Sequence, residues 1–146
     1  MSKKVADILK RKTPEKSMVV VSSEITVLEA LRIMSDKNVG SVVVIDNGKY
    51  QGIMTERDYS RKIALKGRSS TETKVKEILT IELPTVNPKD SIEHCMQLMT
   101  DKNIRYLPVF ENGTIINIVS INDVVKETIL SQEETITHLR DYVHST

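Results

Sequence analysis

Residues 52–58 read GIMTERD, and residues 117–123 read NIVSIND. Around this pair the chain repeats itself at an offset of 65 positions, with 10 identities over the 44 positions of 18–61. Two short leaders, 5–9 and 75–79, also match each other, at an offset of 70. A repeat of this length indicates one supersecondary unit used twice, with neither copy closing a core well by itself.

Each copy predicts the order strand, helix, strand, strand, helix. The first strand lies at 18–21 or 83–86, and hairpins follow at 41–54 and 106–119, each with an Asn-Gly turn. The helix between them has apolar residues at i, i+3, i+4 and i+7, namely Val27, Ala30, Leu31 and Met34 in one copy and Ile92, Cys95, Met96 and Met99 in the other. Capping-box spacing, Thr26 with Glu29 and Asp90 with Glu93, predicts where these helices begin.

The repeats set the expected organisation of the chain. We expect one repeat over 1–67, a linker over 68–74, a second repeat over 75–130 and a C-terminal helical tail over 131–146 with Ile136, Leu139 and Val143 on one face. Valine and isoleucine, sixteen each against ten leucines, favour pleated surfaces. The sequence therefore predicts an α+β fold in which two β-α-β-β-α repeats pack with pseudo-twofold symmetry.

Composition excludes several classes of function. The formal net charge is +1, and the chain has one Phe and no Trp, so neither a basic field nor aromatic stacking favours nucleic acid. The single Cys95 excludes an intramolecular disulfide framework and a Cys-rich zinc site, and it lies on an apolar helix face as a core thiol would. Histidines 94, 138 and 144 are scattered, so we expect no metal site. No apolar run approaches the length of a membrane span, and no signal peptide is evident, which predicts a cytoplasmic protein.

The Thr-x-x-Asp or Ser-x-x-Asp tetrads at the two corners have two interpretations. Thr55 with Asp58, and Ser120 with Asp123, have the spacing of a helix-capping box. Both tetrads also follow an apolar strand directly, and a carboxylate at such a corner can accept hydrogen bonds from both hydroxyls of a ribose. The hydroxyl and the free N–H groups of the helix start can meet phosphate. The two roles are compatible, and the residues alone leave both open.

A basic cluster begins within the first tetrad and extends beyond it. Arg57 lies in the first turn of its expected helix, where the helix dipole disfavours a cation, whereas a bound anion would favour it. Arg61 and Lys62 lie one turn further on, and the second copy has the less basic Asn122 and Lys126 at the places of Arg57 and Arg61. The cluster indicates phosphate contacts at the first corner; the alternative is a set of solvated cations paired with acids such as Glu56.

A unit of about 60 residues that occurs twice and ends in Gly, two apolar residues and Thr-x-x-Asp resembles the CBS domain. Two in tandem resemble a CBS domain pair, or Bateman module, over roughly residues 5–130. Residues 39–44 and 104–109 are also similar to the family, and 55–62 with 66–70 resemble the stand-alone single-pair proteins of bacteria and plant organelles. Asn117 replaces the usual glycine of the motif.

The resemblance implies two ligand sites, each between the corner of one repeat and the first two strands of the other. The first would combine the corner of Asp58 with an adenine slot in 83–86, and its expected residues are Ile53, Met54, Thr55, Arg57, Asp58, Arg61, Pro84, Thr85, Arg105 and Tyr106. The second would combine the corner of Asp123 with strands 19–21 and 40–41, and its expected residues are Val20, Gly40, Ser41, Val119, Ser120, Asn122 and Asp123.

The resemblance also implies the function. We expect a non-catalytic regulatory module that binds AMP, ADP, ATP or NAD(H), forms a homodimer and modulates an unidentified partner protein. A nucleotide-independent interaction scaffold with vestigial sites is the alternative. A nucleotide hydrolase is a third hypothesis, against which stands the lack of a placed general base or metal cluster in the sequence.

Overall fold

The computed structural model describes residues 3–13 and 17–145, and the chain divides into two units built from exchanged segments. One unit contains 84–146 together with the N-terminal residues 1–12, and the other contains 13–83. The leader 5–9 therefore lies with the second repeat, and the leader 75–79 lies with the first. Each unit is described by itself below.

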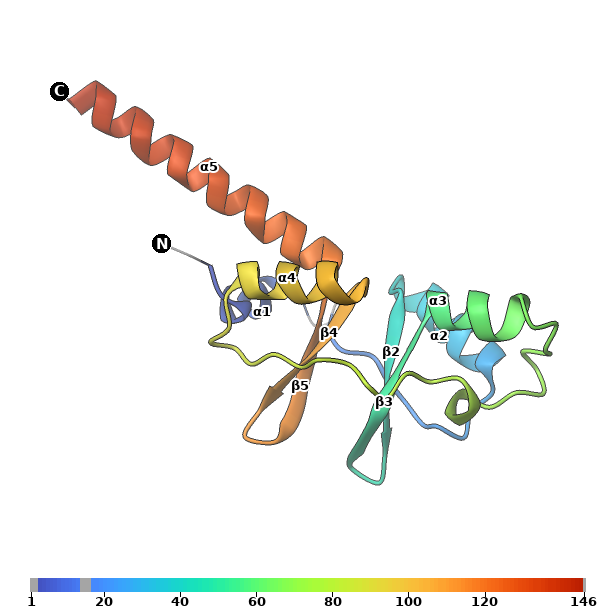
Figure 1. The fold of residues 1–146 in the computed structure, drawn as a ribbon. Helices are drawn as coiled ribbons and strands as arrows, with labels where there is room; N and C mark the ends of the chain where they lie inside the picture. The colour runs from blue at the N-terminus through green and yellow to red at the C-terminus, as the bar shows by residue number, and fades with distance from the viewer. Residues whose placement is uncertain (1–2, 14–16, 146) are drawn as a thin grey trace. The chain divides into compact units, whose positions relative to one another are not determined.

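The unit of residues 13–83 contains a three-stranded sheet. Strand β1 (Val20–Val21) pairs parallel with β2 (Ser41–Asp46), which pairs antiparallel with β3 (Lys49–Thr55). Helix α2 (Val27–Lys37) lies between β1 and β2 in the chain; α3 (Glu56–Tyr59), the π-helix η2 (Ser60–Ala64) and the 3₁₀ helix η3 (Val75–Glu77) follow β3 (Figure 1). Side chains from both strands and helices form one core: Val21, Val27, Ala30, Met34, Val42, Val44, Met54, Ile63, Val75 and Ile78.

Local chemistry explains where these elements begin and end. Thr26 caps α2, its hydroxyl accepting from the Glu29 amide at 3.1 Å while the Glu29 carboxylate accepts from the Thr26 amide at 3.1 Å. Asn38 ends the helix in the left-handed conformation, with φ of 53°. Asn47 and Gly48 both have positive φ, which suits the two-residue turn between β2 and β3. The predicted capping box of α2 and the predicted Asn-Gly turn are thus both confirmed.

The other unit has a two-stranded sheet and includes the 25-residue helix that ends the described chain. Helix α1 (Val5–Arg11) comes from the N-terminal segment, and α4 (Ile92–Lys102), β4 (Tyr106–Glu111), β5 (Thr114–Ser120) and α5 (Ile121–Ser145) come from the second repeat (Figure 1). Strands β4 and β5 pair antiparallel. The core combines Val5, Ile8, Val86, Ile92, Cys95, Met99, Leu107, Val109, Val119 and Val124.

Three local predictions in the second repeat needed correction. The strand expected at 83–86 is reduced to one parallel bridge between Val86 and Val109. Helix α4 is capped by Ser91, whose hydroxyl accepts from the His94 amide at 3.1 Å, and not by Asp90, whose carboxylate instead accepts from the Asn87 amide at 2.8 Å. The expected tail helix is continuous with the last helix of the repeat, giving the 25 residues of α5.

Backbone and apolar contacts hold the exchanged leaders. In the N-terminal leader, the Val5 amide donates to the Asp90 carbonyl at 2.8 Å, and Val5 and Ile8 are buried among residues of the second repeat. In the second leader, the Val75 amide donates to the Ile25 carbonyl at 2.9 Å, and Val75 with Ile78 enters the core of residues 13–83. None of the helices in the described part of the chain has the length and hydropathy of a membrane-spanning segment.

Candidate functional site

The first corner, where β3 ends and α3 begins, is a complete capping box. The Asp58 amide donates to the Thr55 hydroxyl at 3.1 Å, and the Thr55 amide donates to Asp58 Oδ2 at 2.9 Å. The capping interpretation of this tetrad is therefore confirmed. The box fixes the position of the carboxylate but uses mainly one of its two oxygens.

The second oxygen of Asp58 is held by two further groups. Thr80 donates its hydroxyl proton to Oδ1 at 2.8 Å, and Lys62 Nζ forms an ion pair with the same oxygen at 2.9 Å. Lys62 also donates to the Ile78 carbonyl at 2.8 Å. The Asp58 side chain is only 8% exposed, so these donors offset the cost of taking a carboxylate out of water.

Backbone pairing places Thr80 beside the corner. The Ile53 amide donates to the Thr80 carbonyl at 3.0 Å, and the Thr80 amide donates to the Ile53 carbonyl at 2.7 Å. Gly52 permits this close approach, because its φ is +146° and a Cβ there would overlap the Thr80 carbonyl oxygen and lie 2.8 Å from Leu79 Cδ1. The glycine of the motif thus admits the segment that supplies Thr80.

The three basic residues near the first corner have different surroundings. Lys62, one helical turn beyond Asp58, forms the ion pair with it. Arg61 is exposed in η2, and Arg57 is partly buried in α3. Arg61 and Lys62 both lie in the π-helix η2, and π-type turns recur at functional sites.

The second corner has the same box with a different cation. The Ser120 amide donates to Asp123 Oδ2 at 2.9 Å, and the Asp123 amide donates to the Ser120 hydroxyl at 3.2 Å. Lys12, from the segment that follows α1, pairs with Asp123 Oδ2 at 3.0 Å and donates to the Ile118 carbonyl at 2.8 Å. The Asp123 side chain is 26% exposed, so this carboxylate is more accessible than Asp58.

A buried acid lies one turn beyond the second corner. Glu127 is 2% exposed, pairs through Oε1 with Arg11 Nε, and its Oε2 has no hydrogen-bond partner among the described residues. The last residue of α1 and the residue after it therefore supply two consecutive cations to two acids of α5, Arg11 to Glu127 and Lys12 to Asp123.

The other predicted site residues lie in both units. In the unit of 13–83, Ile53 and Met54 are buried in β3, Ser41 is buried at the start of β2, Gly40 is partly buried before it, and Val20 is exposed in β1. In the other unit, Val119 is buried in β5, Pro84 and Tyr106 are partly buried, and Thr85, Arg105 and Asn122 are exposed. Each predicted site takes residues from both units, so the assembly of each site stays a prediction.

Sequence reasoning missed Thr80 and Lys12 as neighbours of the two acids. Thr80 directly follows the second leader, and Lys12 closely follows the first, so the matching leaders were the available signal. No cluster of three or more His, Cys, Asp or Glu side chains suited to a metal ion is present in residues 3–13 and 17–145.

Comparison with known proteins identifies the family to which the chain belongs. The family model for the CBS domain matches residues 5–65 and 75–129. The CBS domain-containing protein CBSX3, mitochondrial, of Arabidopsis thaliana is 40% identical over 146 residues, covering 95% of this chain and 71% of its own. The chain therefore belongs to the CBS domain family and carries two CBS domains, as the repeat predicted.

Solved structures support the same assignment. A protein described as a putative signal-transduction protein with CBS domains, from Burkholderia ambifaria, has a TM-score of 0.83 and 41% identity, with 88% of this chain and 96% of that chain covered. The CBS domain pair of protein MJ0100, solved with 5′-methylthioadenosine and S-adenosyl-L-methionine, shares the fold at a TM-score of 0.73 and 24% identity, covering 86% of this chain and 95% of its own. The predicted α+β fold of paired CBS repeats is confirmed.

Proposed function

We propose that this protein is a regulatory module that binds an adenosine nucleotide, AMP, ADP, ATP or NAD(H), at the corners of Asp58 and Asp123. In this proposal it works as a homodimer, of twice the 16.5 kDa of one chain, and modulates a partner protein. Binding would favour one arrangement of the module over another, so the nucleotide would act by shifting a population.

The observation that carries the proposal is the fixed carboxylate of Asp58. Its capping box and its contact with Thr80 hold both oxygens in place at the end of a strand, where ribose hydroxyls could donate to them. Arg57 precedes Asp58 directly, Arg61 follows it by three residues, and both would supply charge-assisted hydrogen bonds to phosphate. The chemistry matches a ribose phosphate better than an uncharged nucleoside.

The two corners should bind with different strength. The first has Arg57 and Arg61 near its acid, whereas the second has Asn122 and Lys126 at the matching positions. Charge-assisted hydrogen bonds contribute about 1.5–3 kcal/mol each, so the loss of the cation at the place of Arg57 separates the affinities by roughly 10- to 150-fold. The corner of Asp58 is therefore proposed as the tighter phosphate site.

One observation favours the scaffold as a second candidate function. Both acids already have a cation within their own unit, Lys62 at 2.9 Å from Asp58 and Lys12 at 3.0 Å from Asp123. A ribose must compete with these ammonium groups for the carboxylate oxygens. A module whose corners stay closed in this way would present a constant surface to its partner.

Calorimetry with AMP, ATP, NADH and adenosine separates the two candidates. The sensor predicts binding of intact nucleotide, with Asp58→Asn removing the tighter phase and Asp123→Asn sparing it. Arg57→Ala should weaken AMP about 10- to 150-fold and leave adenosine nearly unchanged, because only the phosphate contact is lost. Mass spectrometry of small molecules released from the purified, denatured protein shows whether the sites were already filled.

The control is Glu111→Gln, which neutralises an exposed acid at the turn of the β4–β5 hairpin, the end opposite Ser120. It should bind like the unaltered protein. No binding by verified empty protein at millimolar nucleotide would support the scaffold instead, and turnover of the nucleotide would support a hydrolase. Loss of the tight phase in Asp123→Asn but not in Asp58→Asn would reverse the assignment of the two corners.

A further inference from the structure

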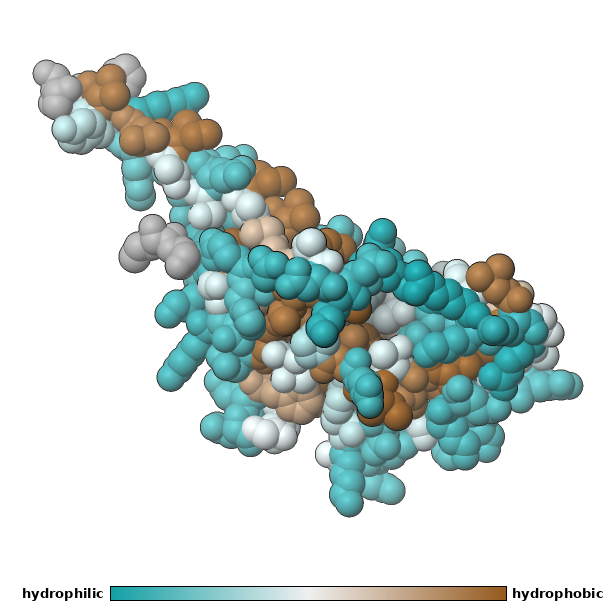
Figure 2. All heavy atoms as spheres, in the orientation of Figure 1, coloured by the Kyte–Doolittle hydropathy of each residue, from teal (hydrophilic) through white to brown (hydrophobic). Residues whose placement is uncertain are grey.

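Helix α5 carries an exposed apolar stripe with heptad spacing. In heptad notation, isoleucines 129 and 136 and Val143 occupy position a, and Val125, Gln132 and Leu139 occupy position d. The four residues Val125, Ile129, Ile136 and Leu139 are 47–61% exposed, which is unusual for side chains of this kind arranged in a row. Figure 2 shows apolar surface along the length of this helix.

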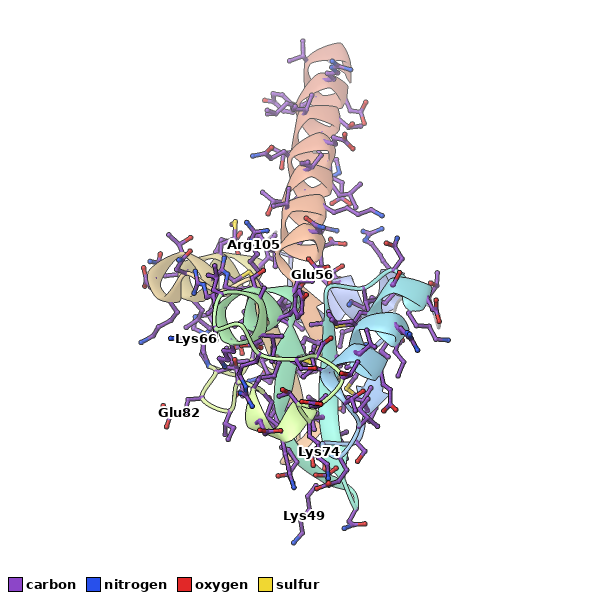
Figure 3. The ribbon with its side chains drawn as sticks, turned by 90° about the vertical axis from the view of Figure 1, so that its right-hand side faces the viewer. Lys49, Glu56, Lys66, Lys74, Glu82 and Arg105 are labelled. Atoms are coloured by element: carbon purple, nitrogen blue, oxygen red, sulfur yellow. The ribbon has the colours of Figure 1, made fainter. Side chains whose placement is uncertain are left out.

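The opposite face of α5 holds the helix to its own unit. Val124 and Glu127 are buried, and Glu134 pairs with Lys3 of the N-terminal segment at 3.1 Å. Glu127 and Glu134 both occupy heptad position f, directly across the helix from the a and d stripe. Beyond α1 and α4 the helix continues away from its own unit, and its side chains spread outward on both sides (Figures 1 and 3). The stripe therefore faces away from the core that the helix helps to form.

We propose that α5 pairs with α5 of a second copy of this chain as a parallel, two-stranded coiled coil over residues 125–143. β-Branched residues at a together with leucine at d favour two parallel strands, and Ile129, Ile136 and Leu139 follow this rule. Gln132 at d meets the partner's Gln132 in a parallel pair, where each amide can both donate and accept. A polar residue at one layer of the stripe fixes the register of the two helices.

Charge distinguishes the parallel pair from the antiparallel one. The charged e positions are Lys126, Glu133 and Arg140. In a parallel pair in register, Glu133 faces the partner's Thr128 and Arg140 faces the partner's Thr135, so no like charges meet. In the antiparallel pair that overlaps the whole stripe, Lys126 faces the partner's Arg140, and the two Glu133 carboxylates face each other. Because like charges destabilise such contacts, the helix favours a parallel partner of its own sequence.

Pairing of α5 does not depend on nucleotide binding. The stripe lies on the far side of α5 from Glu127 and Glu134, and Asp123 with its capping box lies at the start of the helix. The pairing specifies how the proposed homodimer is joined. The coiled coil and the nucleotide sites can consequently fail separately in experiments.

Cysteine cross-linking of the full chain tests the geometry. Leu139→Cys should form a disulfide-linked dimer under mild oxidation at least about tenfold faster than His138→Cys, the neighbouring exposed residue at position c. The unaltered protein serves as background, because Cys95 is buried. Equal rates for the two variants would overturn the proposal. So would faster linking in a mixture of Ile129→Cys and Leu139→Cys than in Leu139→Cys alone, because that pairing is antiparallel.

Sedimentation equilibrium tests the energetics without cysteines. Ile136→Asp places a charge at a buried layer of the pair and should raise the dimer dissociation constant about a hundredfold or more, whereas Thr137→Asp, at exposed position b, should leave it within about threefold. Both variants should fold, since both side chains are exposed in the single chain, and circular dichroism checks this. An unchanged dissociation constant for Ile136→Asp overturns the coiled coil even where nucleotide still binds.

Discussion

Replacing Gly52 by alanine tests how the first corner is built. The new Cβ would overlap the Thr80 carbonyl oxygen and approach Leu79 Cδ1 to 2.8 Å. The backbone φ of +146° is also one that a residue with a side chain rarely adopts. Backbone must move, because the nearest obstacle is a carbonyl and not the end of a flexible side chain. The segment that carries Thr80 would then separate from β3.

The structure sets the size of the effect. Adverse backbone conformation costs about 1–3 kcal/mol. The two hydrogen bonds between Ile53 and Thr80, at 3.0 and 2.7 Å, add about 1 kcal/mol each when they are lost. Gly52→Ala should therefore lower the free energy of unfolding by about 3–5 kcal/mol. Gly67→Ala is the matched control, because Gly67 has a φ of +65° with open space around it, and it should cost only about 1 kcal/mol.

Urea denaturation followed by circular dichroism measures both variants, and amide hydrogen exchange locates the change. Exchange at Ile53 and Thr80 should accelerate in Gly52→Ala and stay slow in Gly67→Ala. Nucleotide binding at the Asp58 corner should weaken as well, since Thr80 helps to hold that carboxylate. If Gly52→Ala loses no more stability than Gly67→Ala, the close approach of Thr80 does not constrain this corner, and the reasoning is refuted.

Three other predictions follow from buried groups. Burial raises the pKa of the Cys95 thiol to about 11, so a thiol reagent at pH 8 should modify folded protein at least about a hundredfold more slowly than urea-unfolded protein. Because the unfolded thiol ionises near pH 8.5, this residue should make the free energy of unfolding fall as pH rises from about 8.5 to 11, a slope that Cys95→Ala should lack. Arg11→Ala should cost about 3 kcal/mol and Glu127→Gln less, since only the first change leaves a buried carboxylate unpaired; equal losses in urea denaturation would contradict this. Lys62→Met should lower thermal stability by about 1–3 kcal/mol through its lost pair with Asp58, and an unchanged melting temperature would show that the pair contributes nothing.

Periodicity predicted most of the fold because each signal was local. Apolar residues three and four apart on α2 and α4 identified their buried faces, and the Asn-Gly pairs identified both hairpin turns. Asn38 and Asn103, aligned by the repeat, both adopt φ of 53° and end their helices at the same place. Since one pattern occurred twice, each copy supported the interpretation of the other.

Contacts between distant segments were not predictable in this way. The tetrads indicated the capping boxes of Asp58 and Asp123, but nothing near them in sequence pointed to Thr80 or Lys12, which lie 22 residues after one acid and 111 residues before the other. The continuity of α5 was also missed, although the sequence has no glycine or proline near the expected boundary at 130.

The exchange of leaders also determines the order in which the chain can fold as it is synthesised. The residues of 13–83 are contiguous, so this unit can close once they have been made. Helix α1 is made earlier, yet its partners Val109, Val119 and Val124 come about a hundred residues later. At about 5–20 residues per second, Val5 and Ile8 wait roughly 6–24 seconds for the surface that buries them. A released chain that ends at residue 83 should therefore resist protease in 17–83 while remaining cleavable within 3–12, and protection of both segments at that length would show that the first helix has found another partner.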